Sequence, residues 1–140
     1  MRPLAPLCAG LLLAATGGAA QTPEPPPVVR AGLEAYRQQG AAAAFRIWLV
    51  GSPIPEGQVG SNKAAFDQIE IGYGHMVGYD VLKVVPVGPH VSRTYIVMLY
   101  EKGPVYIYFD CYRGSERWIM TAFFFHARPD SILPRSMLDH

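Results

Sequence analysis

Residues 92–113 read SRTYIVMLYEKGPVYIYFDCYR, and the architecture expected of the whole chain follows from their pattern. Both of its halves are rich in β-branched and aromatic residues, which favour strands. Lys102 and Gly103 separate the halves and are few enough to form a tight hairpin turn. The stretch therefore predicts two antiparallel strands that pair directly.

Two further segments of the same texture flank this hairpin. They are YDVLKVVPV at residues 79–87 and ERWIMTAFFFHA at residues 116–127, and GPH and GS separate them from the hairpin. Short separators between strand-like segments are typical of consecutive antiparallel strands. The second half of the chain thus predicts a four-stranded meander.

The chain before residue 79 has a helical period instead. Within residues 28–51, apolar or small residues recur at gaps of three and four. They are Leu33, Tyr36, Gly40, Ala43, Ile47 and Val50. Prolines and glycines in residues 51–60 should end this helix. Residues 61–72 predict a shorter second helix, with Ser61 as N-cap and Gly72 or Gly74 closing it.

Packing these elements together predicts an α+β fold. Two N-terminal helices would cover one face of a curved four-stranded antiparallel meander sheet. We expect one such domain over residues 29–129, preceded by a proline-rich linker at residues 21–28 and followed by a C-terminal tail at residues 130–140. We expect the linker to be a tether or, alternatively, a ligand for a proline-binding groove.

Residues 1–20 have the pattern of a secretory signal peptide. Arg2 precedes the apolar run LCAGLLLAAT, and the small residues Gly18 and Ala20 fit a cleavage site before Gln21. The alternative is an N-terminus without fixed structure or one tucked into a membrane. Cleavage would deliver a periplasmic or secreted protein, and no later segment is apolar enough to anchor it stably in a membrane.

Charge and cysteine content exclude other classes for the cleaved chain. Without Arg2, eleven basic residues face eleven acidic ones, so neither nucleic acid nor an anionic membrane surface is indicated. Without Cys8, Cys111 is the one remaining thiol, and no internal disulfide can form. The fold must therefore be stabilised by its core.

The element order resembles that of the NTF2-like and cystatin-like cone folds. The resemblance covers about residues 28–127 and is carried by IEIGYGHMVGYDVL at 69–82, LYEKGPVYIYF at 99–109 and RWIMTAFFF at 117–125. It implies a curved sheet that wraps around helices. It implies no single activity, because this fold hosts enzymes, carriers and interaction modules.

Strand register assigns residues to the two faces of the sheet. A two-residue turn at residues 114–115 places Cys111 opposite Trp118 on an apolar, helix-facing side. The same register puts Phe124 and His126 on that side. Cys111 is therefore expected to be a small buried core residue and not a nucleophile.

The opposite face gathers charged and tyrosine side chains. Tyr95 is expected opposite Asp110, with Arg93 and Arg117 at diagonal positions within reach of the carboxylate. A bulge at Gly103 would instead send the side chains of residues 92–100 to the opposite faces of the sheet. Seven residues make up the predicted partner- or ligand-binding surface. They are Arg93, Tyr95, Tyr106, Tyr108, Asp110, Tyr112 and Arg117.

This surface is too apolar to be left open to water, which favours a contact surface for a protein partner or an apolar small molecule. A homodimer packed back to back through the sheet is the simplest form. The alternative is a solvated face on which tyrosines pair across strands.

An enzyme of the cone-fold type is the second hypothesis. His126 would act as base in a cavity between helices and sheet. The cavity candidates are Thr94, Tyr100, Trp118 and His126. The histidines lack metal-ligand spacing, and the glycines of residues 72–78 do not fit a dinucleotide loop, so no metal or cofactor is predicted. The apolar helix-facing side favours a small exported non-catalytic binding module.

Overall fold

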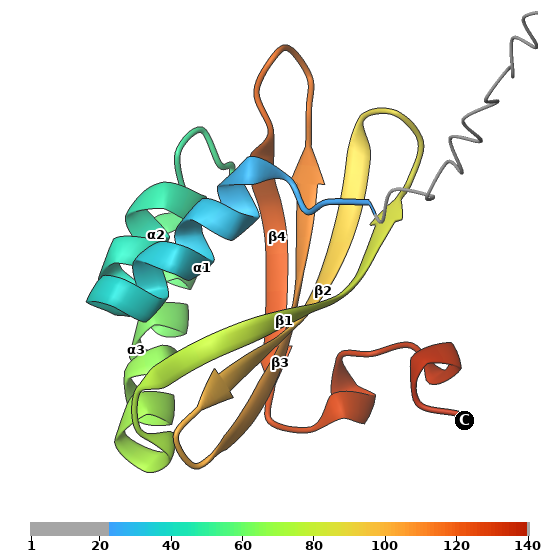
Figure 1. The fold of residues 1–140 in the computed structure, drawn as a ribbon. Coiled ribbons are helices and arrows are strands. Elements are labelled where there is room, and N and C mark those ends of the chain that lie inside the picture. Colours follow the sequence, from blue (N-terminus) through green and yellow to red (C-terminus); the bar gives the residue numbers. More distant parts are fainter. Residues whose placement is uncertain (1–22, 140) are drawn as a thin grey trace, which may run out of the picture.

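The computed structural model describes residues 23–139, in which three helices precede a four-stranded antiparallel sheet (Figure 1). The helices and strands are α1 (Pro27–Gln39), α2 (Ala41–Trp48), α3 (Glu56–Tyr73), β1 (Met76–Pro86), β2 (Val91–Tyr100), β3 (Gly103–Tyr112) and β4 (Ile119–His126). The sheet order β1-β2-β3-β4 is a meander. The predicted α+β class is confirmed, whereas the predicted leader at residues 1–20 lies outside the described residues.

The first predicted helix is in fact two helices separated by Gly40. This glycine has φ 90° and ψ −178°, and its N–H donates to the Tyr36 carbonyl at 2.8 Å. Residues that carry a side chain rarely adopt a positive φ, so glycine suits this break. The chain reverses there, and α2 folds back beside α1 (Figure 1). The single helix expected over residues 28–51 was wrong because the apolar stripe continues across the break.

Gly32 and Trp48 allow α1 and α2 to approach each other closely. The Trp48 indole is fully buried, and its Nε1–H donates to the Val29 carbonyl at 3.4 Å. A Cβ atom on Gly32 would overlap the indole ring. A residue without a side chain is therefore required where the two helices meet.

The helix α3 starts five residues earlier than predicted. Pro55 precedes it, and the Ser61 hydroxyl donates to the Gly57 carbonyl at 3.2 Å inside the helix. Ser61 is therefore not the N-cap. Gly74, with φ 84°, ends the helix as predicted.

The core fills the space between the helices and one face of the sheet. Aromatic rings from α2, α3, β3 and β4 meet there, with Trp48 5.0 Å from Phe109 and Phe45 5.8 Å from Phe123 between ring centroids. Phe66 of α3 joins them at 5.7 Å from Phe45. The interior on the helix-facing side is thus packed with rings.

Both segments flanking the domain are in contact with it. Pro25 and Pro26 are buried, and α1 begins at Pro27, inside the range predicted as a linker. The C-terminal segment forms two short 3₁₀ turns and lies on the side of the sheet away from the helices (Figure 1). Its Leu133 is only 9% exposed, so this segment also packs against the protein.

The register between β2 and β3 differs from the prediction by two residues. Tyr100 lies opposite Gly103, so the tight turn consists of Glu101 and Lys102. Arg93 therefore lies directly opposite Asp110, the position predicted for Tyr95. A shift by two residues moves partners along the strand but leaves every side chain on its predicted face.

The register between β3 and β4 differs from the predicted register by more than that between β2 and β3. Cys111 lies opposite Met120, not Trp118, because the connection between these strands is longer than a two-residue turn. Thr121 is an extra residue in β4, since the next pair joins Asp110 to Ala122. Beyond this bulge the faces are reversed relative to the prediction.

Substitution of Gly32 tests the close approach of α1 and α2. We expect Gly32→Ala to lower the free energy of unfolding by about 1–3 kcal/mol or more, because the buried indole has no free space to move into. Gly60→Ala is the matched control: Gly60 lies in α3, and a Cβ there would contact nothing within 4 Å. That variant should gain up to about 1 kcal/mol from helix propensity. Urea unfolding followed by circular dichroism measures both, and equal stability of the two variants would contradict this packing.

Candidate functional site

Three aromatic side chains lie side by side across β2, β3 and β4 on the face away from the helices. The ring centroids of Tyr95 and Tyr108 are 6.0 Å apart, and those of Tyr108 and Phe124 are 5.4 Å apart. These residues are direct cross-strand partners. We call Tyr95, Tyr108 and Phe124 the aromatic strip. Its exposure rises from 8% at Tyr95 to 53% at Phe124.

An ion pair fixes the middle of the aromatic strip. Arg93 donates from Nε and Nη2 to the two carboxylate oxygens of Asp110 at 2.7 and 2.8 Å. Its guanidinium carbon lies 4.0 Å from the centroid of the Tyr108 ring. The hydrogen bonds to Asp110 raise the pKa of Arg93 further above its usual range. Arg93 therefore holds Tyr108 in place by charge and by stacking.

The C-terminal segment, residues 127–139, lies over one part of this face of the sheet and leaves another part exposed. Tyr95 and Val97 point away from the helices, yet both are 8% exposed, and Leu133 of the segment is buried as well. We attribute the burial of these two strand residues to the C-terminal segment, which lies on that side of the sheet. Phe124 at 53% exposure and Tyr112 at 44% remain open to solvent.

The structure brings together four of the seven predicted binding residues: Arg93, Tyr95, Tyr108 and Asp110. Tyr106 lies further along β3, opposite Val97 and His126, and Tyr112 ends that strand. Arg117 does not join Asp110 as predicted. It lies in the longer connection between β3 and β4 and lines a groove beside the helices.

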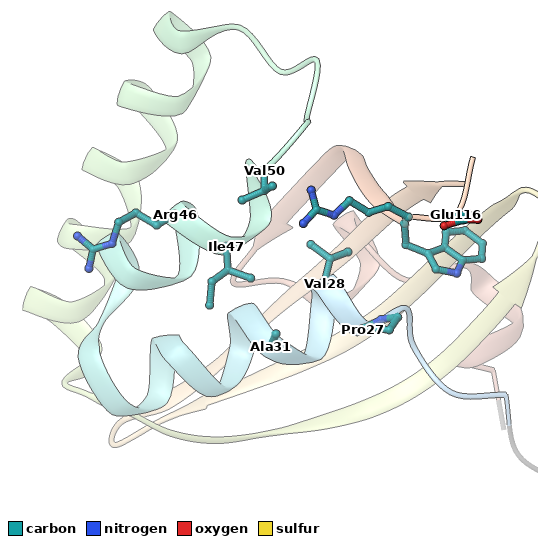
Figure 2. A pocket seen from close by; sticks show the side chains of 9 residues that line it. Pro27, Val28, Ala31, Arg46, Ile47, Val50 and Glu116 are labelled. Carbon is teal, nitrogen blue, oxygen red and sulfur yellow. The ribbon is translucent and has the colours of Figure 1, made fainter. Parts of the chain in front are cut away.

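This groove was not predicted. It has a volume of about 490 Å³, and α1, α2 and the β3–β4 connection contribute to its lining, including Arg117 and Trp118. Figure 2 shows Val28, Ile47 and Val50 around it, with the Arg46 side chain directed away. Ile47 and Val50 belong to the apolar stripe of the predicted helix, yet both line this open groove, and Val50 is 44% exposed.

The four cavity candidates of the enzyme hypothesis do not share a site. Thr94 is fully buried and its hydroxyl has no hydrogen-bond partner among the described residues. His126 is exposed, and its Nδ1 accepts from the Arg128 N–H at 2.9 Å. The bulge at Thr121 places His126 opposite Tyr106, on the face away from the core and not on the side of Cys111 as predicted, and at the strand end it also borders the groove beside α3. Trp118 lies outside the strands, beside the grooves at the start of α1.

Tyr100, the remaining candidate, takes part in a buried hydrogen bond. Its hydroxyl donates to the Tyr36 hydroxyl at 2.9 Å. Burial raises the pKa of Tyr100 to about 12, and burial also raises that of Tyr36, with smaller contributions from Tyr100 and Glu70. Both phenols stay protonated at neutral pH, so the pair joins α1 to β2 and supplies no base.

Two further properties concern the whole of residues 23–139. In this range no three His, Cys, Asp or Glu side chains gather in a way that could hold a metal ion. None of the helices described has the length and apolar character needed to cross a membrane.

The chain was compared with known protein families, proteins and structures. No family model, curated protein or solved structure matches the chain. The resemblance to the NTF2-like and cystatin-like folds stays a prediction. The site must therefore be interpreted from its own geometry.

Cys111 gives a direct test of which face points inward. It is fully buried, and burial together with the nearby Asp110 carboxylate raises the pKa of its thiol to about 12. In a chain that begins at Gln21, we expect a disulfide reagent at pH 8 to modify Cys111 at least about a hundredfold more slowly than in urea. Absorbance of the released thiolate measures both rates. Rapid reaction of the folded protein would mean that the two faces are assigned the wrong way round.

Proposed function

We propose that this chain is a small exported non-catalytic module that binds a protein partner through the uncovered end of the aromatic strip. The observation that carries the proposal is Phe124, a phenylalanine that is 53% exposed on the edge strand of an ordered sheet. Exposed apolar surface of this kind is typical of interaction sites. The proposal includes no cofactor and no metal.

The support around Phe124 favours recognition of a partner by a prepared surface. Tyr108 packs against the Phe124 ring, and the Arg93–Asp110 ion pair in turn fixes Tyr108. Side chains that are already ordered lose little entropy when a partner binds. Tyrosine and arginine are also enriched at protein interfaces.

A protein partner fits this surface better than an apolar small molecule does. The aromatic strip lies on one face of a sheet, whereas small ligands prefer concave sites. The groove lined by Val28, Ile47 and Trp118 is the place in this fold where a small apolar ligand would bind instead. The two surfaces lie on opposite sides of the sheet, so substitutions can separate them.

Export is the second part of the proposal. It rests on the leader pattern of residues 1–20 and on a core that needs no disulfide, since Cys111 is buried and free. A periplasmic or secreted module would meet its partner outside the cytoplasm. Self-association of the chain is treated below.

Substitution of Phe124 tests the binding surface. Peptides selected from a random phage-displayed library against the chain beginning at Gln21 would serve as the probe, with affinities measured by calorimetry. We expect Phe124→Ser to weaken their binding at least tenfold, which corresponds to about 1.4 kcal/mol, because the exposed ring is the apolar centre of the surface. Val77→Ser is the matched control, since Val77 is an equally exposed strand residue at 59% on β1.

Selected peptides that bind the Phe124→Ser variant as tightly as the unmodified chain would contradict the assignment of the surface. If Val28→Ser alone abolished binding, the groove beside the helices would be the binding site instead.

A further inference from the structure

The two edges of the sheet differ in how they are protected against pairing with another chain. The edge strand β1 has register irregularities between Met76 and Gly78 and between Val81 and Lys83, and it ends in Pro86. Bulges, charged side chains and proline are the devices by which proteins block an open edge. The β1 edge is therefore closed to a further strand.

The opposite edge, β4, has almost none of these devices. Its sequence IMTAFFFH contains no proline, lysine, arginine or carboxylate, and its one irregularity is at Thr121. Its backbone makes no hydrogen bond outside the pairing with β3 within the described part of the chain. Beyond Thr121, the stretch from Ala122 to His126 pairs regularly with β3 and leaves its outer backbone groups free.

We propose that β4 pairs antiparallel with β4 of a second copy of this chain, so that two four-stranded sheets join into one of eight strands. In a two-fold arrangement, when residue i contacts residue j of the second copy, j contacts i in return, and only a residue on the axis contacts its own counterpart. Phe124 is the centre of the regular stretch, so it lies at the two-fold axis. Ala122 then faces His126 of the second copy, and Phe123 faces Phe125.

The composition of β4 suits a second copy as its partner. A strand that pairs antiparallel with its own copy places residues of the same short stretch opposite one another, and like charges directly opposite each other would destabilise the pair. The residues from Ala122 to Phe125 carry no charge, so self-pairing meets no repulsion. The exposed Phe124 ring would pack on its counterpart, and the aromatic strip would run without interruption through both copies.

A groove beside the same edge supplies further contact area. It lies between α3 and the end of β4, has a volume of about 550 Å³, and is lined by apolar residues such as Ala65, Ile69 and Phe125. Specific interfaces need about 800 Å² from each partner, more than a short strand alone provides. Antiparallel pairing brings the start of the second copy's β4 beside α3, so that end of the second copy would cover this groove.

This inference rests on the proposed function, because the same exposed Phe124 serves both. It specifies one partner and one geometry, in contrast to the back-to-back arrangement expected from the sequence. The C-terminal segment already covers part of the face that a back-to-back dimer would need.

A cysteine at the axis tests the pairing. In the chain beginning at Gln21, oxidised Phe124→Cys should form a disulfide between two copies, because directly opposed strand residues have Cβ atoms about 4.5–5.5 Å apart. We expect most of the protein to run as a dimer on a non-reducing gel. Val77→Cys on the β1 edge and Ile71→Cys on α3, at 59% and 76% exposure, should stay monomeric under the same oxidation. The buried Cys111 should not interfere.

Sedimentation equilibrium of the unmodified chain and of Phe124→Lys completes the test. The unmodified chain should have twice the monomer mass, and Phe124→Lys should raise the dimer dissociation constant at least tenfold, since it places two like charges at the axis. A dimer without preferential cross-linking at Phe124→Cys would overturn the edge pairing, as would a monomer at all concentrations. The peptide assay with Phe124→Ser, carried out below the dimer dissociation constant so that the surface is free, decides the proposed function separately.

Discussion

Trp48 lies where α1, α2 and the sheet meet, and the arrangement of all three depends on its burial. Its ring packs 5.0 Å from Phe109 of β3, and its N–H donates to the backbone of α1 at Val29. The indole reaches this place because α2 turns back at Gly40, and α1 can approach it because Gly32 has no side chain. Two glycines thus determine how the helices cover the sheet, and with it which face stays free for contacts.

The sequence predicted the sheet better than the pairing within it. Alternation of apolar and polar residues identifies all four strands and sends Cys111 inward and Asp110 outward, because burial acts on each face as a whole. A shift of two residues leaves this alternation unchanged. The alternation therefore could not distinguish the predicted pair, Tyr95 with Asp110, from the observed pair, Arg93 with Asp110. The extra residue at Thr121 has no signature in the pattern, and it is what exposes Phe124 and His126.

Other parts of the site depend on contacts between distant segments. Gly40 continues an apolar stripe, so nothing local distinguishes it from a residue inside one long helix. Leu133 follows Ile132 in a short segment of mixed polar and apolar residues after the last strand, and no periodic pattern marks it as buried. Arg117 was assigned to Asp110 because the preceding turn was taken to be short, and a longer turn carries it to the groove beside the helices.

The position of Leu133 also bears on the order in which the molecule is completed. Each strand of the meander pairs with its neighbour in sequence, so the sheet can form from local contacts as the chain emerges. The segment to which we attribute the burial of Tyr95 and Val97 follows all four strands in the sequence, so it is synthesised after the sheet. Until it arrives, a nearly complete domain presents an apolar surface to chaperones and to other chains. Closure of that surface is therefore a sign that synthesis has passed Leu133.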